Sequence, residues 1–327
     1  MAESAKRDVR TALDIVQLSK GDKIGQWEII KKLGEGGFGA VYLVKNSSGN
    51  EYALKAEKAT ETVKVLKMEV VVLGELKKAK AKHFCDILDS GNIWNYNYVV
   101  MTLVGPSFHD LRKRYTDPVK QKFSLGCALS VGIKCIEAIE ELHLVGYLHR
   151  DIKPGNFAIG LTDYRKVLML DFGMARRYLD PNGEIRKPRW AAGFRGTVRY
   201  APLSCHISRE QCRKDDLETW TYMQIELTKG YLPWKRIENR EEVGRYKDRC
   251  RNDAIKELFG GCPKEYLHIL DYVDNLRYYD VPDYNKIRGF LRDAITLNKV
   301  QEYPYDWEEQ LEKEAKMEKE KSKVELG

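Results

Sequence analysis

The chain has 327 residues, of which 43% are hydrophobic, and this length fits two domains or one two-lobed unit with a substantial core. The net charge of +7 is modest, so it favours acidic or phosphorylated partners and does not by itself indicate binding to nucleic acid. The seven cysteines are scattered and form no Cys-x-x-Cys pair, which argues against a zinc site and a disulfide framework and fits a cytoplasmic protein.

No segment of the sequence predicts secretion or attachment to a membrane. Residues 1–10 are polar with no apolar stretch behind them, and the chain has no run of about 18 apolar residues. We therefore expect residues 1–20 to form a polar N-terminal extension. We expect neither a membrane nor a nucleic acid as a partner.

Residues 27–103 have the patterns of a β-rich region that contains one helix. Strands are predicted at residues 27–30, 40–44, 52–55, 87–90 and 98–103. Residues 46–50 are rich in turn formers, so the second and third strands should form a hairpin. Apolar side chains recur at helical spacing over residues 62–77, which predicts a helix with one buried face.

The pattern becomes helical after Gly105-Pro106, where we place the boundary between two lobes. Helices are predicted at residues 129–143, 217–227, 240–251, 264–276 and 284–297. From residue 307 onward Glu and Lys alternate, which predicts a solvated terminal helix.

The segment Gly34 to Val41 matches the pattern Gly-x-Gly-x-x-Gly-x-Val, with glycines at positions 34, 36, 37 and 39. Glycines let a backbone approach phosphate groups closely and direct N–H groups at them. Dinucleotide-binding enzymes use a similar pattern, but there the glycines open a helix. Here a strand follows, which disfavours a dinucleotide-dependent oxidoreductase.

Lys55 ends the next predicted strand, and its side chain could be a solvated strand lysine or a cation that reaches bound phosphates. Glu69 lies beside the apolar face of the predicted helix and should point inward. A buried carboxylate without a partner is costly, so we expect Glu69 to pair with Lys55.

The loop from His149 to Asn156 combines a carboxylate, two cations and an amide, and it contains Pro154-Gly155. Taken alone, it fits a charged surface turn as well as a functional loop. A buried strand ends at Asp171-Phe172-Gly173, where the carboxylate could hold Mg²⁺. Asn156 is the second candidate metal ligand.

Together these motifs occur in the order found in eukaryotic protein kinases, and over residues 25–300 the chain resembles that family. The resemblance implies an α+β, bilobal protein kinase fold. Its small N-lobe would be β-rich with one main helix, and its larger C-lobe mostly helical. The expected boundaries are a kinase domain at residues 21–303, made of N-lobe 21–101, hinge 102–106 and C-lobe 107–303. Residues 304–327 are expected to be a charged tail.

Several segments resemble the casein kinase 1 superfamily in particular. They are Leu103 to Leu111, Gly196 to Ala201, Asp215 to Glu218 and Leu232-Pro233-Trp234. Most kinases carry Ala-Pro-Glu where this chain has Pro202-Leu203-Ser204, and the superfamily also lacks that glutamate. Asn156-Phe157-Ala158 and Gly193 to Tyr200 look most like the tau-tubulin kinase branch.

The resemblance implies transfer of the γ-phosphate of ATP, with Mg²⁺, to Ser or Thr of protein substrates. Asp151 would orient the substrate hydroxyl, Lys153 would neutralise the γ-phosphate, and Thr197 would support both. Asn156 and Asp171 would hold Mg²⁺.

By the same resemblance, Lys55 would bind the α- and β-phosphates while Glu69 fixes it in place. The glycines at 34, 36, 37 and 39 would cover the phosphates. The adenine site would be formed by Val41, Ala53, Met101, Thr102, Val104 and Ala158. Met101 matches the gatekeeper, and the small Ala158 should leave a roomy floor beneath the adenine.

The activation segment is unusual because it contains no serine or threonine between Phe172 and Gly196. Arg150, which precedes Asp151, therefore has no phosphoserine or phosphothreonine partner within it. We expect activity without loop phosphorylation.

The activation segment is also rich in basic residues. Arg199, Lys235 and Arg236 match an anion pocket of the casein kinase 1 superfamily, and Arg245 or Lys247 could complete it. This predicts a preference for acidic or phospho-primed substrates, whereas the simpler alternative is a solvated cationic surface.

One further alternative remains beside an active kinase. It is a nucleotide-binding pseudokinase scaffold, although all the catalytic residues are present. The tau-tubulin likeness points to cytoskeletal substrates, but only by analogy, which is a poor guide to targets. We expect a cytoplasmic monomer.

Overall fold

The computed structural model describes residues 17–36, 39–59, 65–93 and 95–325. It divides into two compact units. The first contains residues 1–74 and 85–103, and the second contains residues 75–84 and 104–327. The chain enters the second unit for the last time between Leu103 and Val104, within the predicted hinge.

The first unit is built on a six-stranded antiparallel sheet with the strand order β1-β2-β3-β4-β6-β5. The strands are β1 (Lys23–Ile24), β2 (Trp27–Gly36), β3 (Gly39–Lys45), β4 (Glu51–Lys58), β5 (Ile87–Ile93) and β6 (Tyr96–Met101). Their alternating apolar side chains bury Tyr42, Leu54 and Val100 completely on the core side. The predicted hairpin of residues 40–44 and 52–55 is β3 and β4.

Helix α1 (Val65–Lys78) follows β4 and matches the described part of the helix predicted at residues 62–77, of which 62–64 lie outside the described residues. Val65, Leu66, Leu73 and Leu76 are buried on one side of it, in agreement with the apolar periodicity. Glu69 is buried on this helix as well.

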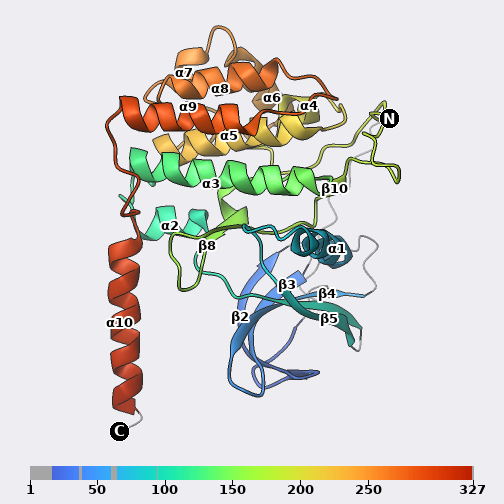
Figure 1. Cartoon of the computed structure of the whole chain (residues 1–327), viewed down its shortest axis with the longest axis vertical. Coiled ribbons are helices and arrows are strands. Elements are labelled where there is room, and N and C mark those ends of the chain that lie inside the picture. Colours follow the sequence, from blue (N-terminus) through green and yellow to red (C-terminus); the bar gives the residue numbers. More distant parts are fainter. Residues whose placement is uncertain (1–16, 37–38, 60–64, 94, 326–327) are drawn as a thin grey trace. The chain divides into compact units, whose positions relative to one another are not determined.

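The second unit is mostly helical, and α3 contacts both α9 and α5, with the three helices running in similar directions in Figure 1. Its helices are α2 (Phe108–Arg114), α3 (Leu125–Leu144), α4 (Leu203–His206), α5 (Arg213–Lys229), α6 (Arg240–Arg249), α7 (Ile255–Phe259), α8 (Glu265–Asp274), α9 (Tyr284–Leu297) and α10 (Glu308–Glu325). Short two-stranded sheets pair β7 (Tyr147–Leu148) with β10 (Arg176–Arg177) and β8 (Phe157–Ile159) with β9 (Val167–Met169). Within the described residues, no helix is long and apolar enough to cross a membrane.

The folded core of the second unit extends beyond the predicted domain end at residue 303. Trp307 is fully buried and packs edge-on against Phe123, with ring centroids 5.2 Å apart, and it also contacts Phe108. The Tyr305 hydroxyl lies 3.0 Å from Ser130 Oγ in α3. Residues 305–307 therefore belong to the core, because large aromatic side chains outweigh the charged composition around them.

Candidate active site

Asp151 is the centre of a small network in the second unit. Lys153 Nζ donates to Asp151 Oδ2 at 2.6 Å, and the Thr197 hydroxyl donates to Asp151 Oδ1 at 2.7 Å. Lys153 Nζ also lies 3.2 Å from Thr197 Oγ1. The predicted catalytic residues of the loop and Thr197 are thus in direct contact. One carboxylate is held by a cation and a hydroxyl from two separate segments.

The backbone before Asp151 is held by a buried carboxylate from α5. Asp216 accepts from the backbone N–H groups of His149 at 2.8 Å and Arg150 at 2.9 Å, and it lies 2.9 Å from His143 Nε2. Arg150 has a positive φ of 67°, a conformation that is unfavourable for a residue with a side chain. The two hydrogen bonds that Asp216 accepts stabilise this strained turn, and with it the position of Asp151.

Asn156 and Asp171 are brought together by the β8–β9 hairpin. Phe157 pairs with Met169, and the N–H of Leu170 donates to the Asn156 carbonyl at 2.8 Å, so the two candidate metal ligands flank the same end of the hairpin. Asn156 Nδ2 donates to the Asp151 carbonyl at 2.8 Å, which leaves the amide oxygen for a cation. An amide oxygen and a carboxylate are the hard donors that Mg²⁺ takes in proteins, so this pair fits that ion.

In the first unit, the glycine motif is the turn between β2 and β3. Gly34 pairs with Val41 and Gly36 with Gly39, so a strand precedes and a strand follows the motif. A Cβ on Gly39 would lie 2.1 Å from the Ala56 carbonyl oxygen, which explains why this position needs glycine. The strand–turn–strand arrangement agrees with the predicted phosphate-binding loop and not with a dinucleotide fold. Gly37 lies outside the described residues.

Lys55 Nζ and Glu69 Oε2 are 2.7 Å apart in the first unit, and Glu69 is almost completely buried. The expected pair is therefore present. Val41 is the partner of Lys55 across the β3–β4 pairing, and Ala53 is the partner of Met101 across β4 and β6.

The remaining predicted adenine-site residues are Thr102 in the first unit and Val104 and Ala158 in the second unit. The Thr102 N–H donates to the Asp86 carbonyl at 3.0 Å. Val104 is the first residue of the second unit after β6, and Ala158 is buried in β8.

A cavity of about 590 Å³ in the second unit lies beside the catalytic loop. It is lined by His109, Arg112, Lys113, Gln121, Lys153, Pro154, Gly155, Thr197, Arg199 and Tyr200. This lining contains four Lys or Arg side chains and no carboxylate. The cavity therefore places a cationic surface next to Asp151, which contacts both Lys153 and Thr197.

Glu226 in α5 is the buried carboxylate beneath this cavity. It pairs with Arg112 at 2.9 Å and with Arg199 at 3.2 Å, and it accepts a hydrogen bond from the Tyr200 hydroxyl. Two guanidinium groups share one carboxylate, so one positive charge remains uncompensated. Lys113 adds a second, because it is exposed and has no carboxylate partner among the residues described.

The residues predicted for the substrate anion site differ in exposure and in whether they line this cavity. Arg199 lines the cavity, whereas Lys235, Arg236 and Arg245 are exposed and do not contribute to its lining. Lys247 is fully buried, and its Nζ donates to the carbonyls of residues 198 and 201 at 2.8 and 2.7 Å. The expectation that Lys247 completes an anion pocket is therefore wrong. Its amine faces backbone oxygens and not solvent.

Three functional candidates were missed from the sequence. His109 and Lys113 lie on α2, a helix that was not predicted because it is only seven residues long. Its N-terminal signal was present, since Ser107 caps the helix by accepting from the Asp110 N–H at 3.2 Å. Glu226 had no distinguishing sequence signal, because only the packing of α5 against the 199–200 segment gives it a role.

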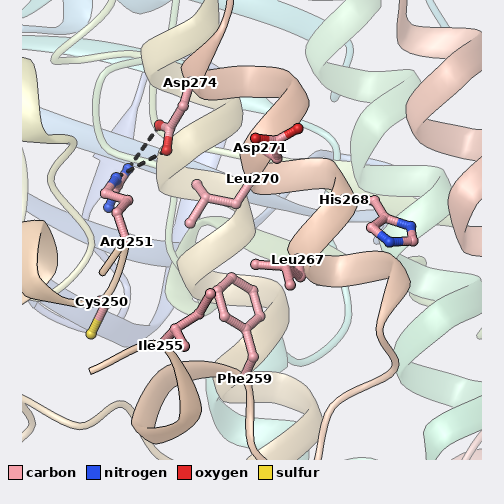
Figure 2. Close-up of a pocket in the computed structure, with 9 residues that line it drawn as sticks. All are labelled: Cys250, Arg251, Ile255, Phe259, Leu267, His268, Leu270, Asp271 and Asp274. Atoms are coloured by element: carbon pink, nitrogen blue, oxygen red, sulfur yellow. Dashed lines mark hydrogen bonds and ion pairs between the residues drawn. The ribbon is translucent and has the colours of Figure 1, made fainter. Parts of the chain in front are cut away.

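A second cavity, of about 350 Å³, lies in the second unit near α7 and α8 and is shown in Figure 2. Ile255, Phe259 and Leu267 form its apolar part, and Arg251 reaches the Asp274 carboxylate at 3.0 Å at its edge. None of the predicted site residues lines it. It is therefore not the candidate active site.

Known proteins resemble this chain over most of its length. The family model "Protein kinase domain" matches residues 27–267. A probable serine/threonine-protein kinase of Dictyostelium discoideum is 38% identical over 291 residues, which cover 88% of this chain and 57% of that protein. The serine/threonine-protein kinase spe-6 of Caenorhabditis elegans is 38% identical over 291 residues, covering 86% of this chain and 76% of that protein.

A third relative is casein kinase I homolog 3 of Schizosaccharomyces pombe, which is 32% identical over 86% of this chain and 65% of its own length. This chain thus spans a little more than half of the Dictyostelium relative and about two thirds of the yeast relative. The family model covers the glycine turn, the Lys55–Glu69 pair and the Asp151 network alike. The chain belongs to the protein kinase family, and its relatives are named as serine/threonine kinases.

Proposed function

We propose that the chain is an active serine/threonine kinase that uses ATP and Mg²⁺. The observation that carries this proposal is the contact of Asp151 with both Lys153 and Thr197. Phosphoryl transfer asks the protein mainly for positioning and charge neutralisation. A carboxylate held in this way can orient a substrate hydroxyl, and the neighbouring ammonium group can compensate the charge on the phosphate that is transferred.

The chain also supplies residues that would hold Mg²⁺ and residues that would bind the phosphates of ATP. Asn156 and Asp171 would hold Mg²⁺, which when bound neutralises charge on the phosphate oxygens. Lys55 would bind phosphate oxygens, and its pairing with the buried Glu69 supports this task because it restricts the lysine to one position. The β2–β3 glycine turn would cover the phosphates with its backbone N–H groups.

We further propose that activity needs no phosphorylation of the activation segment. Glu210 pairs with Arg189 at 3.0 Å and with Arg176 at 3.5 Å, so a built-in carboxylate compensates cations of the segment. Burial would raise the pKa of Glu210, but Arg189 and Arg176 lower it below its ordinary value and keep the group charged. Tyr178 is buried and donates to the His143 carbonyl at 2.7 Å, which argues against its modification.

The cavity beside Asp151 supports a preference for acidic or phospho-primed substrates. Its uncompensated charges come from the Arg112–Arg199–Glu226 group and from Lys113. Guanidinium and ammonium groups bind phosphate and carboxylate oxygens with charge-assisted hydrogen bonds. Glu226 already pairs with Arg112 and Arg199, so it would attract a basic substrate side chain only weakly.

Within the family we place the chain in the casein kinase 1 superfamily, most like the tau-tubulin kinase branch. The yeast casein kinase I homolog supports the superfamily, and the Gly193 to Tyr200 segment supports the branch.

The test is steady-state phosphorylation of serine peptides by the recombinant chain after phosphatase treatment, with Asp151→Asn as the control. We expect transfer by the untreated and the treated enzyme at the same rate, and none by the control. A treated enzyme that stays inert until another kinase acts on it would disprove independence from loop phosphorylation. No turnover in any form, with ATP still bound, would favour the alternative of a nucleotide-binding scaffold.

Substrate preference is tested with paired peptides that differ by one upstream phosphoserine. The primed peptide should have the higher kcat/KM, and Lys113→Ala should reduce this difference. Lys235→Ala is the matched control, because Lys235 is exposed outside the cavity. Equal kcat/KM for both peptides would refute the preference.

A further inference from the structure

We propose that Lys247 is a positioning residue that holds the substrate-binding wall of the active site from behind, with Trp234 as its partner. This inference rests on the proposed kinase function, since it concerns the cavity where the protein substrate would bind. It assigns a role to a buried charged side chain that takes no part in the phosphotransfer network around Asp151.

Lys247 makes contacts on every side of its amine. Nζ donates to the carbonyls of Val198 at 2.8 Å and Ala201 at 2.7 Å, and it lies 3.1 Å from His206 Nε2. The amine also lies 5.3 Å from the centre of the Trp234 ring. Its donors are therefore satisfied although the side chain is completely buried.

Trp234 completes the same attachment. Its indole Nε1–H donates to the Arg199 carbonyl at 2.8 Å, and the ring itself is buried. Three of the four carbonyls from Val198 to Ala201 are thus bound by Lys247 and Trp234. Neither side chain belongs to the segment that they hold.

The other side of the 198–201 segment forms part of the wall of the cavity beside Asp151. The side chains of Arg199 and Tyr200 line the cavity, and both bind Glu226. The backbone is therefore held by one pair of residues, and the side chains by another. Loss of the backbone contacts would free Arg199 and Tyr200 to leave the positions in which they meet substrate.

The ion pair between Arg251 and Glu218 supports the backbone that follows at Leu203. The Leu203 N–H donates to Glu218 at 2.9 Å, and Arg251 pairs with Glu218 at 3.0 Å. Arg251 is the residue that also reaches Asp274 in Figure 2, and its Nη1 donates to the Lys247 carbonyl at 3.0 Å. This chain lacks the Ala-Pro-Glu glutamate, and these contacts provide a different attachment for the end of the activation segment.

The attachment tolerates a change in the charge of Lys247. Burial lowers the pKa of Lys247 to about 7, against the opposing effect of Glu218 and Cys205. His206 faces the amine, and burial lowers its pKa to about 4. The ammonium has three N–H groups and the neutral amine has two, so the two carbonyls keep their donor in either state.

The experiment compares Lys247→Met, which keeps an unbranched side chain one atom shorter but removes the donor, with Trp234→Phe, which keeps a ring but removes the indole N–H. Lys256→Met is the control, since Lys256 is an exposed lysine of α7. Steady-state kinetics are measured with the peptide and ATP varied separately. We expect Lys247→Met to raise the KM for peptide about tenfold, the factor that corresponds to one charge-assisted hydrogen bond, with little change in the KM for ATP.

Trp234→Phe should raise the peptide KM about fivefold, because it removes one neutral hydrogen bond. A folded Lys247→Met enzyme with the wild-type peptide KM would overturn the inference. If Lys247→Met does not fold, Trp234→Phe decides in the same way. Amide hydrogen exchange over residues 198–203 should be faster in both variants. This readout needs no turnover, so unchanged exchange refutes the attachment even if the proposed kinase activity itself fails.

Discussion

Replacing Asp216 by alanine should destabilise the second unit severely, because this side chain holds the backbone before Asp151, the proposed catalytic residue. It accepts from the N–H groups of His149 at 2.8 Å and Arg150 at 2.9 Å, and it lies 2.9 Å from His143 Nε2. Asp216 and His149 are almost completely buried, so water cannot easily replace the lost acceptor. The change leaves two backbone donors without partners.

The size of the effect follows from these contacts. A buried donor that is left unsatisfied costs about 1–3 kcal/mol, so two of them cost about 2–6 kcal/mol. This is a large part of the roughly 5–15 kcal/mol by which a folded domain is stable. Asp216→Asn keeps one oxygen acceptor and should lose about half as much. Arg150, with its φ of 67°, should relax to an ordinary conformation in the alanine variant and displace Asp151.

The assay is urea unfolding followed by circular dichroism, together with kcat measured far below the unfolding transition. Asp293→Ala is the control, because Asp293 is exposed on α9 and a change there should stay within about 0.5 kcal/mol. We expect the free energy of unfolding to decrease from wild type to Asp216→Asn and further to Asp216→Ala. The value of kcat should decrease in the same order. A loss of less than about 1 kcal/mol in Asp216→Ala would refute the reasoning, since it is below the cost of even two weakly unsatisfied donors.

Three other predictions concern separate parts of the chain. Lys55→Met should lower kcat by about 100-fold or more with the fold intact, because it removes the cation that Glu69 holds at 2.7 Å. Burial alone would lower the pKa of His83, but Glu137 and Glu141 outweigh it and raise that pKa above 6.5, so the folded state retains the proton to higher pH than the unfolded chain. The resulting stabilisation is complete below pH 6.5 and is lost as the pH rises through the folded-state pKa. Trp307→Ala should cost about 3–5 kcal/mol, because it empties a fully buried aromatic site.

These predictions are checked by kinetics, by melting temperature across pH 5.5–8.5 and by urea unfolding, respectively. His83→Gln should remove the part of the pH dependence that lies above pH 6.5, and an unchanged profile would contradict the assignment. Tyr303→Ala is the control for Trp307→Ala, since Tyr303 is a partly exposed aromatic residue of the same segment. Equal losses of unfolding free energy in Trp307→Ala and Tyr303→Ala would contradict the prediction that Trp307 contributes more to the core than Tyr303.

Local chemistry in the sequence was sufficient to predict most elements of the fold. The helix predicted at 284–297 is α9 with the same bounds, because its apolar spacing and its Asp283 cap act within a few residues. The β3–β4 hairpin and the strand after the glycine motif were predicted for the same reason. The order of the kinase motifs likewise predicted a protein kinase domain, which the family model confirms.

Tertiary packing decided which of the cations predicted for the anion site are buried and which are exposed. Lys247 and Arg245 are two residues apart on α6, and the sequence made them equal candidates for an anion site. In the folded chain Lys247 is buried against the carbonyls of the 198–201 segment, whereas Arg245 is exposed. Residues two apart on a helix point in different directions, and only the packed neighbours determine which direction is the interior.

The C-terminal segment shows the same division between composition and packing. Its charged composition predicts a solvated helix, and α10 from Glu308 onward is helical. Composition could not reveal that Trp307 enters the aromatic cluster of Phe108 and Phe123, because those residues lie about 200 positions earlier in the chain. The sequence by itself determined most of the elements and the order of the kinase motifs. The tertiary structure determined the burial, and therefore which cations are free to bind substrate and which hold the chain in place.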